Sequence, residues 1–477
     1  MTAARSPSRR SVLAGGLALL ATPGLRRAAL AATPPLDSLL AASGLTGVTT
    51  LALADADTGA PIEAWQADTA LPPASVAKVL TTLYALDALG PDYRFRTAVR
   101  ADGTLDGGVL RGDLALAGDG DPVLDTDALG RLVAALRTAG LRAVDGRLRV
   151  AAGALPAVAA IDPDQPDTAG YNAAVAGTNL NFNRVFLAWT PGKAGPDLAF
   201  SAPGETWSAA PPGFAAELVP TGRVAHRIAG GREVWTLPRP GFRGRGSIWL
   251  PVRDPGAYAG GVFATLAAGA GIALPAAEIV PAAAGSILAV HASPPLERVL
   301  RDMLRYSTNL TAECVGLRAT QARGGAPADL AASGAAMTAW ARGRYGLAAT
   351  ALANHSGLSD ASRLTARDML AVLAGAADGP LPALLPERPI LDADRKPADF
   401  TGVRVVSKTG TLNFASGLAG YVLGRRRLAF AIFAADPDQR ARIPPDARDD
   451  PPGAAAWARR ARALEQALLR RWASIYA

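Results

Sequence analysis

The sequence predicts an α+β protein, with an antiparallel sheet flanked by helices and a large, mostly-β domain inserted into it. A strand hairpin followed by a helix stands near the N-terminus, and the chain ends in three strands and a helix. Between them lies a long stretch of short apolar runs broken by glycine and proline. We expect one domain made of residues 32–95 and 289–477, with residues 96–288 inserted. A chain of 477 residues that is 49% hydrophobic can build the cores that this requires.

The first elements are a hairpin over Gly47–Trp65 and a helix that begins near Ser75. Strand-like alternation flanks the turn Asp57-Thr58-Gly59, and prolines end the extended stretch at positions 72 and 73. Apolar residues then recur with the helical period at Val76, Val79, Leu80, Leu83 and Leu86. Gly90-Pro91 supplies the glycine and following proline that typically end a helix.

The middle of the chain, from about Arg96 to Ser286, predicts the inserted β domain. Turn clusters such as Gly118-Asp119-Gly120-Asp121-Pro122 separate its short apolar runs. We expect a single helix in it, Thr126–Ala139. The expected strands are Leu114–Ala117, Leu148–Ala151, Arg184–Trp189, Glu233–Leu237 and Ser247–Val252.

Helices and then strands complete the chain after Ser293-Pro294, which reads as an N-cap with proline in the first turn. The expected helices follow this cap and then cover about Ala328–Tyr345, Thr365–Ala376 and Ala454–Ser474. The expected strands are Val403–Ser407, which leads into Lys408, and a hairpin of Leu418–Leu423 and Leu428–Ala434.

The first 31 residues predict a twin-arginine signal peptide. Arg9-Arg10 precede an apolar run, Val12–Ala21, and the small-residue site Ala29-Leu30-Ala31 follows. That run is shorter than the roughly 20 residues a membrane helix needs, and no apolar run after Ala31 is long enough for one. We therefore expect an exported protein of the periplasm or cell envelope, with no transmembrane segment after cleavage.

Charge and cysteine content exclude several classes of function. The first 31 residues carry five arginines and no acid, so cleavage lowers the formal charge from +8 to +3. The chain has no basic block with interleaved aromatic residues, which argues against a nucleic-acid partner. A single cysteine, Cys314, rules out a disulfide within the chain. The acids Asp119 and Asp121 are explained by turn chemistry, so we expect neither a metal nor a cofactor.

Lysine is rare in this chain, and two of its lysines stand in short motifs. Only four of the 49 basic residues are lysines: Lys78, Lys193, Lys396 and Lys408. Lys78 closes Ser75-Val76-Ala77-Lys78 at a predicted helix start, where positions i and i+3 share a face. Unlike arginine, a buried lysine can lose its proton. A neutral Lys78 could thus act as the base that activates the Ser75 hydroxyl.

Two further motifs supply polar groups to the same predicted site. Ser307-Thr308-Asn309 follows a helix, so its hydroxyl and amide could relay a proton and hold a peptide carbonyl, although an ordinary capping turn explains it as well. Lys408-Thr409-Gly410-Thr411 ends a strand, where an extended peptide can pair with the edge and Gly410 permits close approach. The hydroxyls of Thr409 and Thr411 could receive a carboxylate. The backbone N–H groups of Ser75 and Thr411 could form an oxyanion hole.

The three motifs, in this order, are the pattern of penicillin-binding proteins and class A β-lactamases. The chain resembles one group of them more closely, the class C low-molecular-mass penicillin-binding proteins. These are the D-alanyl-D-alanine carboxypeptidase/endopeptidases of the S13 peptidase family. Further matching stretches are Leu71-Pro72-Pro73-Ala74-Ser75, Tyr93-Arg94-Phe95, Gly120-Asp121-Pro122, Ser293-Pro294-Pro295-Leu296, Ser356-Gly357-Leu358-Ser359 and Arg363-Leu364-Thr365-Ala366.

The resemblance implies a serine β-lactamase/DD-peptidase (penicillin-binding) fold and a role for each motif residue. Ser75 is implied as the acylated nucleophile and Lys78 as its base. Ser307 and Asn309 are implied in proton transfer and amide binding. The carboxylate site is implied to be formed by Lys408, Thr409, Gly410 and Thr411. Peptidoglycan peptides are the implied substrates and β-lactam antibiotics the implied covalent inhibitors. Thr308 departs from the motif, which has aspartate there.

Two other functions stay open on sequence alone. A β-lactamase would use the same acylation with fast hydrolysis of the drug, although no clear Glu-x-x-Leu-Asn is present to hold a deacylating water. A non-catalytic peptidoglycan-binding envelope module would need a decayed site, whereas all three motifs are intact. A histidine triad is disfavoured because only His226, His291 and His355 exist and no Gly-x-Ser-x-Gly turn is found.

Overall fold

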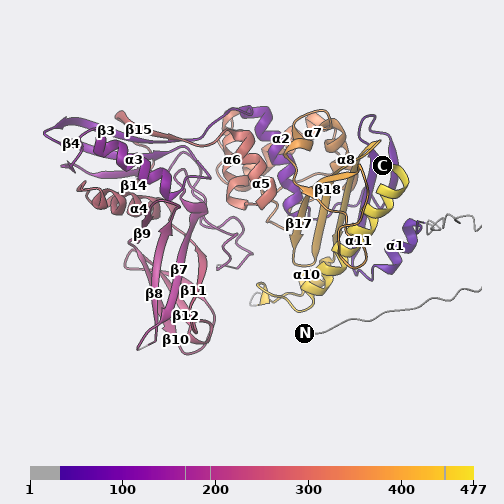
Figure 1. Ribbon diagram of the computed structural model, residues 1–477. Coiled ribbons are helices and arrows are strands. Elements are labelled where there is room, and N and C mark those ends of the chain that lie inside the picture. The colour runs from indigo at the N-terminus through magenta and orange to yellow at the C-terminus, as the bar shows by residue number, and fades with distance from the viewer. Residues whose placement is uncertain (1–32, 167, 194, 445–446) are drawn as a thin grey trace, which may run out of the picture.

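The computed structural model describes residues 33–166, 168–193, 195–444 and 447–477. Figure 1 shows two lobes: one holds the long C-terminal helix and a sheet, and the other is built from the middle of the chain. The predicted signal peptide, residues 1–31, lies outside the described residues.

A six-stranded antiparallel sheet forms the centre of the first lobe, in the order β16-β17-β18-β19-β1-β2. It joins the two ends of the chain, because the N-terminal hairpin pairs with the C-terminal strand β19. The strands are β1 (Val48–Asp55), β2 (Pro61–Trp65), β16 (Glu387–Arg388), β17 (Arg404–Leu412), β18 (Ala415–Leu423) and β19 (Arg427–Ala435). The predicted hairpins are thus present.

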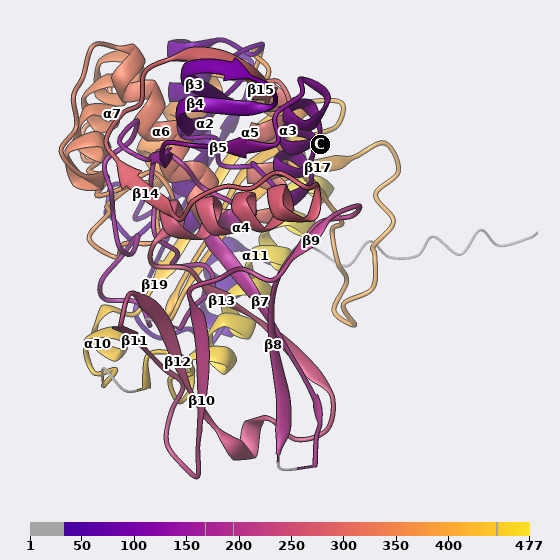
Figure 2. The same cartoon turned by 90° about the vertical axis from the view of Figure 1, so that its left-hand side faces the viewer.

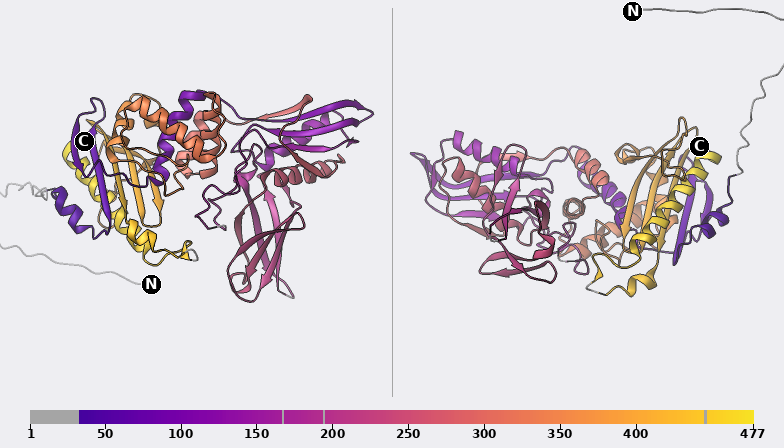
Figure 3. Two further views of the ribbon diagram at one scale, coloured as in Figure 1. Left: turned by 180° about the vertical axis from the view of Figure 1, so that it is seen from behind. Right: turned by 60° about the horizontal axis from the view of Figure 1, so that its bottom comes forward.

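One face of this sheet is covered by α11 (Ala454–Tyr476) and α1 (Leu36–Ala42), which lie on the side away from the other helices (Figure 3). Buried Leu464, Leu468 and Trp472 of α11 pack on Leu51 and Phe430 of the sheet. Apolar residues at these i, i+4 and i+8 positions make one face of a helix, and burying that face stabilises the layer.

The opposite face is covered by a helical layer around α2 (Ala77–Leu89). This helix is buried on nearly every side, from Ala77 to Ala85, and it contacts α5, α6 and α7. A helix with apolar residues all round is typical of a core position. The remaining helices are α5 (Leu296–Tyr306), α6 (Asn309–Ala322), α7 (Leu330–Tyr345), α8 (Ala366–Gly375), α9 (Leu381–Leu384) and α10 (Pro437–Ala441).

The second lobe contains one larger sheet and two smaller ones (Figure 2). The larger sheet runs β14-β6-β4-β3-β15, with β5 beside β4, and its strands are β3 (Arg96–Asp106), β4 (Val109–Gly118), β5 (Ala143–Val144), β6 (Leu148–Ala151), β14 (Ala277–Val280) and β15 (Ser286–Ala292). The smaller sheets, β13-β7-β8-β9 and β10-β12-β11, extend away from it; their strands are β7 (Arg184–Pro191), β8 (Pro196–Pro203), β9 (Ser208–Ala209), β10 (Phe214–Val219), β11 (Ala225–Ala229), β12 (Arg232–Pro238) and β13 (Gly246–Pro251).

Two details of this lobe differ from the sequence expectation. Its described residues form two α-helices, not one: α3 (Thr126–Thr138) and also α4 (Pro255–Gly269). The Asp254 side chain caps α4 by accepting from the Ala257 N–H, and the small residues of α4 masked its helical period. The division of the chain at residues 95 and 288 stays a prediction, and strand β15 crosses the second of these positions because residues 289–292 pair with β3.

Candidate active site

Ser75 lies in a tight turn, η1 (Ala74–Val76), directly before the buried helix α2. The preceding Ala74 has a left-handed backbone with φ of 47°, a conformation that costs a non-glycine residue free energy and is found where surrounding structure enforces it. Strand β17 packs against this turn. The hydroxyl of Ser75 is therefore held at the end of the helix, beside the sheet edge.

The amine of Lys78 connects three segments of the chain at Ser75. Its Nζ donates to Ser75 Oγ at 2.9 Å, to Asn309 Oδ1 at 2.7 Å and to the Ser356 carbonyl at 2.8 Å. Lys78 is fully buried. Burial and then the charge of Lys408 lower its pKa well below the usual value, whereas Glu313 opposes the change. A neutral amine in contact with the serine hydroxyl is thus accessible to this site.

Lys408 and Ser307 form a second lysine–serine contact on the other side of the cleft. Ser307 caps α5 with a left-handed backbone, φ 58°. Lys408 Nζ donates to Ser307 Oγ at 3.0 Å and to the Thr409 carbonyl at 2.7 Å. Burial, followed by the charge of Arg388, lowers the pKa of Lys408 to about 7. This amine therefore changes its charge near neutral pH.

Asn309 links this site to the inserted region. Its Oδ1 accepts from Lys78, and its Nδ2 donates to the Tyr171 carbonyl at 3.0 Å. Tyr171 is half exposed and lines the same cleft. A loop of the second lobe thus forms one wall of the site.

The end of β17 packs closely on the Ser75 turn. A Cβ on Gly410 would lie 2.6 Å from the Pro73 carbonyl oxygen and 3.0 Å from the Ser75 nitrogen. Only glycine permits that approach without a shift. Thr411 follows at the rim and, with Ser75, Ser307 and Asn309, lines a cleft of about 240 Å³.

Thr409 is a predicted site residue whose side chain the structure places away from this cleft. It stands between Lys408 and Gly410, and side chains alternate across a strand. Its hydroxyl accepts from Arg388 Nη2 at 3.3 Å and lines a cavity on the far side of β17. Its assignment to the carboxylate site stays a prediction.

Glu313 and Ser356 support the site, and the sequence reasoning gave them no role. Buried Glu313 accepts from the backbone N–H groups of His355 at 3.0 Å and Ser356 at 2.8 Å, which places the Ser356 carbonyl on Lys78. Burial raises the pKa of Glu313. The sequence did hold a signal for Glu313, since it is an acidic residue one helical turn after Asn309 and therefore on the same helix face.

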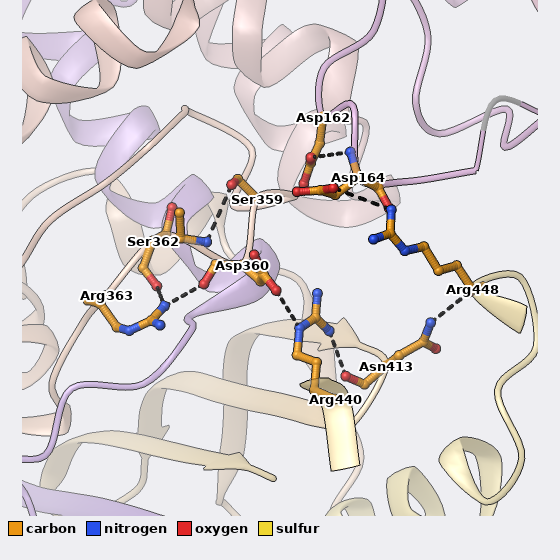
Figure 4. A network of polar contacts seen from close by, with 10 residues as sticks. Asp162, Asp164, Ser359, Asp360, Ser362, Arg363, Asn413, Arg440 and Arg448 are labelled. Carbon is orange, nitrogen blue, oxygen red and sulfur yellow. Dashed lines mark hydrogen bonds and ion pairs between the residues drawn. The ribbon is translucent and has the colours of Figure 1, made fainter. Parts of the chain in front are cut away.

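A polar network borders the cleft and joins loops of both lobes with helix α10 (Figure 4). Arg440 Nε donates to Asp360 at 2.8 Å, and its Nη1 donates to the Asn413 carbonyl at 2.6 Å. Arg448 donates to the Asp164 carbonyl at 2.7 Å. These residues line a cavity of about 370 Å³ that shares Asn413 and Arg440 with the cleft. The network thus holds the cleft mouth together across both lobes.

The imidazole of His355 does not contact the Ser75 site, although its backbone N–H donates to Glu313. His355 is completely buried, its Nε2 lies 2.7 Å from Ser333 Oγ, and burial lowers its pKa to about 3. Among the described residues, no three histidine, cysteine, aspartate or glutamate side chains are grouped to hold a metal ion. The helices of that part of the chain include none with the length and apolar character to span a bilayer.

A likeness to solved structures defines the class of fold. Penicillin binding protein 4 from Haemophilus influenzae matches with a TM-score of 0.71 at 21% sequence identity, over 84% of this chain and 93% of that protein. The predicted penicillin-binding α+β fold is confirmed.

Sequence comparison then gives the family. The model of the D-Ala-D-Ala carboxypeptidase 3 (S13) family matches residues 32–450, and this chain belongs to that family. A D-alanyl-D-alanine carboxypeptidase from an Actinomadura species is 27% identical over 434 residues, covering 83% of this chain and 79% of the relative. Carboxypeptidase DacB of Mycolicibacterium smegmatis is 28% identical over 424 residues, covering 81% and 76%. The predicted family and enzyme class, a D-Ala-D-Ala carboxypeptidase, are confirmed.

Proposed function

We propose that this protein is a serine-type D-Ala-D-Ala carboxypeptidase that cleaves peptidoglycan stem peptides through an acyl-enzyme at Ser75. The observation that carries the proposal is the buried amine of Lys78, 2.9 Å from Ser75 Oγ and 2.7 Å from Asn309 Oδ1. A desolvated lysine is a base that suits the serine hydroxyl near neutral pH.

Acylation begins when Lys78 Nζ takes the proton of Ser75. The Ser75 oxygen attacks the carbonyl between the two D-alanines, and the negative charge that develops on the carbonyl oxygen is received by the backbone N–H groups of Ser75 and Thr411. The C–N bond breaks as Ser307 passes its proton to the leaving amine and is reprotonated by the Lys408 ammonium. The proton that Lys78 took from Ser75 keeps the net charge of the site unchanged. Free D-alanine departs and the acyl group stays on Ser75.

Substrate binding uses the polar groups that surround the serine. The Asn309 amide is placed to hold a peptide carbonyl, although its Nδ2 then exchanges the Tyr171 carbonyl for substrate. The Lys408 charge and the Thr411 hydroxyl at the cleft rim attract the terminal carboxylate. Water then hydrolyses the ester and frees Ser75.

The same acyl group arises from a cross-link between D-alanine and a diamino acid, so endopeptidase action needs only a larger leaving amine. A β-lactam presents a carbonyl and a carboxylate to the same groups, and we expect it to acylate Ser75. Substrates of this kind lie in the cell envelope, which fits export of the chain to the periplasm.

Labelling with a fluorescent penicillin tests the proposal. The purified protein should form a slowly decaying adduct on Ser75 and release D-alanine from muropeptides, and Ser75→Ala should lose both properties. Rapid turnover of the drug would instead favour the β-lactamase. A wild-type protein with neither adduct nor peptidase activity would favour the non-catalytic module.

A further inference from the structure

A second cavity, of about 570 Å³, lies on the far side of β17 from the Ser75 cleft. Its walls are β17 and β18, the loop that follows β16, and helix α11. Thr409 lines this cavity, whereas the side chain of the neighbouring Lys408, on the other face of the strand, contacts Ser307 of the cleft. The strand therefore separates two sites of different composition.

Arginine dominates the polar lining of this cavity. Five arginines contribute to it: Arg388, Arg395, Arg459, Arg462 and Arg470. The acids that line it are Asp392 and Glu465. Burial raises the pKa of Glu465 to about 7, so part of its negative charge is absent at neutral pH. The lining thus carries a clear excess of positive charge.

These arginines are not used in ion pairs of the fold. Within the described residues, none of the five lies within 4.0 Å of a carboxylate oxygen in a salt bridge. Arg388 donates to the Ser407 carbonyl and Thr409, both at 3.3 Å, and Arg470 donates to the Leu391 carbonyl. Arg459 and Arg462 are exposed and stand three positions apart on α11, so they share a face.

The cavity also offers apolar surface beneath these charges. Leu391, Leu418 and Leu469 line it, and the latter two belong to or adjoin the core between sheet and α11. A concave site of this volume with an apolar floor and a few charged groups is typical of a small-molecule site. The positive charge of the lining favours an anionic ligand, and the leucines favour a ligand that also has an apolar part.

We propose that this cavity binds an amphiphilic oxyanion, with its phosphate or carboxylate head on Arg388, Arg459 and Arg462 and its apolar part on Leu418 and Leu469. The guanidinium fork matches the oxygens of either head group in bidentate hydrogen bonds. This site is distinct from the Ser75 cleft, although Arg388 connects the two because its charge lowers the pKa of Lys408.

Isothermal titration with three probes tests the site and separates its possible sources of ligand. Dihexanoyl phosphatidic acid below its micelle concentration represents a free amphiphile, phosphatidylglycerol vesicles represent a membrane lipid, and inorganic phosphate represents the head alone. The wild type should bind the soluble amphiphile at least tenfold more tightly than inorganic phosphate. If the protein binds the vesicles and the arginine variants below weaken that binding, the ligand is a lipid head group. If it binds the soluble amphiphile but not the vesicles, the ligand is a free molecule.

Charge reversal on α11 provides the decisive variant. Arg459→Glu with Arg462→Glu should weaken amphiphile binding by about tenfold or more, since charge-assisted hydrogen bonds are lost. The control is the double variant Arg425→Glu with Arg460→Glu, because both arginines are exposed and lie outside the cavity lining. This variant makes the same change in net charge and should bind the amphiphile as tightly as the wild type does. Melting temperatures check both folds, and Arg462→Gln gives a milder variant. Equal losses in both double variants, or a wild type that binds no soluble amphiphile, would overturn the proposal.

Discussion

Lys408 Nζ lies 3.0 Å from Ser307 Oγ, although 101 positions separate the two residues. This contact faces the one between Lys78 and Ser75 across the same cleft, so two lysines and two serines meet around a single space. Burial and then the charge of Lys408 lower the pKa of Lys78, because like charges disfavour one another in a buried site. The pair of lysines therefore sets how the site responds to pH.

We expect a bell-shaped pH profile for penicillin acylation measured as kcat/KM. The acid limb arises because Lys78 must be neutral to accept the Ser75 proton, so activity is gained as pH rises through its lowered pKa. We expect the alkaline limb near pH 7, where Lys408 loses the charge that we propose attracts the carboxylate of the drug. Because the charges of the two lysines interact, the apparent pKa value of each limb is a property of the pair and not of one lysine alone. Lys408→Arg should move the alkaline limb well above pH 7; an unmoved limb would remove Lys408 as its source.

Replacing Lys78 by arginine should slow acylation strongly while keeping the positive charge. Arginine does not lose its proton in proteins, so it cannot act as the base. The expected loss in penicillin acylation rate is about 10²–10⁴-fold, the usual contribution of a general base. Lys193→Arg, at an exposed position, is the matched control and should leave the rate unchanged. A fully active Lys78→Arg protein would exclude the role proposed for this amine.

Gly410→Ala should impair acylation through geometry alone. The added Cβ would meet the Pro73 carbonyl at 2.6 Å and push β17 away from the Ser75 turn. A displacement of about 1 Å in a catalytic constellation can cost on the order of 10²-fold in rate. Stopped-flow acylation checks this, with Gly343→Ala as control because a Cβ there has nothing within 4 Å. Equal rates for the two variants would show that the close approach has no catalytic importance.

The contacts that the sequence predicted follow from local rules of secondary structure. The contacts that it missed join residues that lie far apart in the sequence and are buried together in the fold. Ser75 and Lys78 are three positions apart on a helix, so their contact follows from helical geometry. The role of Glu313 depends on a loop more than 40 positions away, whose two backbone N–H groups it accepts from. Thr409 illustrates a different limit: its motif suggested the cleft, but strand alternation and Arg388 hold its hydroxyl on the other side.

Glu313→Gln should shift the acid limb of the acylation profile to lower pH. The Glu313 charge raises the pKa of Lys78, so its removal lets the amine become neutral at a lower pH. Glutamine keeps one oxygen acceptor for the loop at Ser356, whose carbonyl contacts Lys78. The pH dependence of acylation is measured beside Glu278→Gln, an exposed control in the second lobe. A lower maximum with the limb unmoved would indicate a structural role only.

Glu465→Gln should remove a pH-dependent loss of stability. The carboxyl of Glu465 is buried beside Ser416, its pKa rises from 4.5 to about 7, and the folded state therefore keeps a proton that the unfolded state releases. For a group of this kind, stability falls as pH rises from about 4.5 to 7 and the loss is complete above that.

The size of this effect follows from the shift of the Glu465 pKa, which corresponds to about 3 kcal/mol. Glutamine still accepts from Ser416 but has no proton to lose, so the free energy of unfolding of the variant should gain on the wild type by up to that amount between pH 4.5 and 7.5. Urea unfolding at several pH values measures the difference, with exposed Glu217→Gln as control. Curves for Glu465→Gln and wild type that run parallel across this range would contradict the assignment.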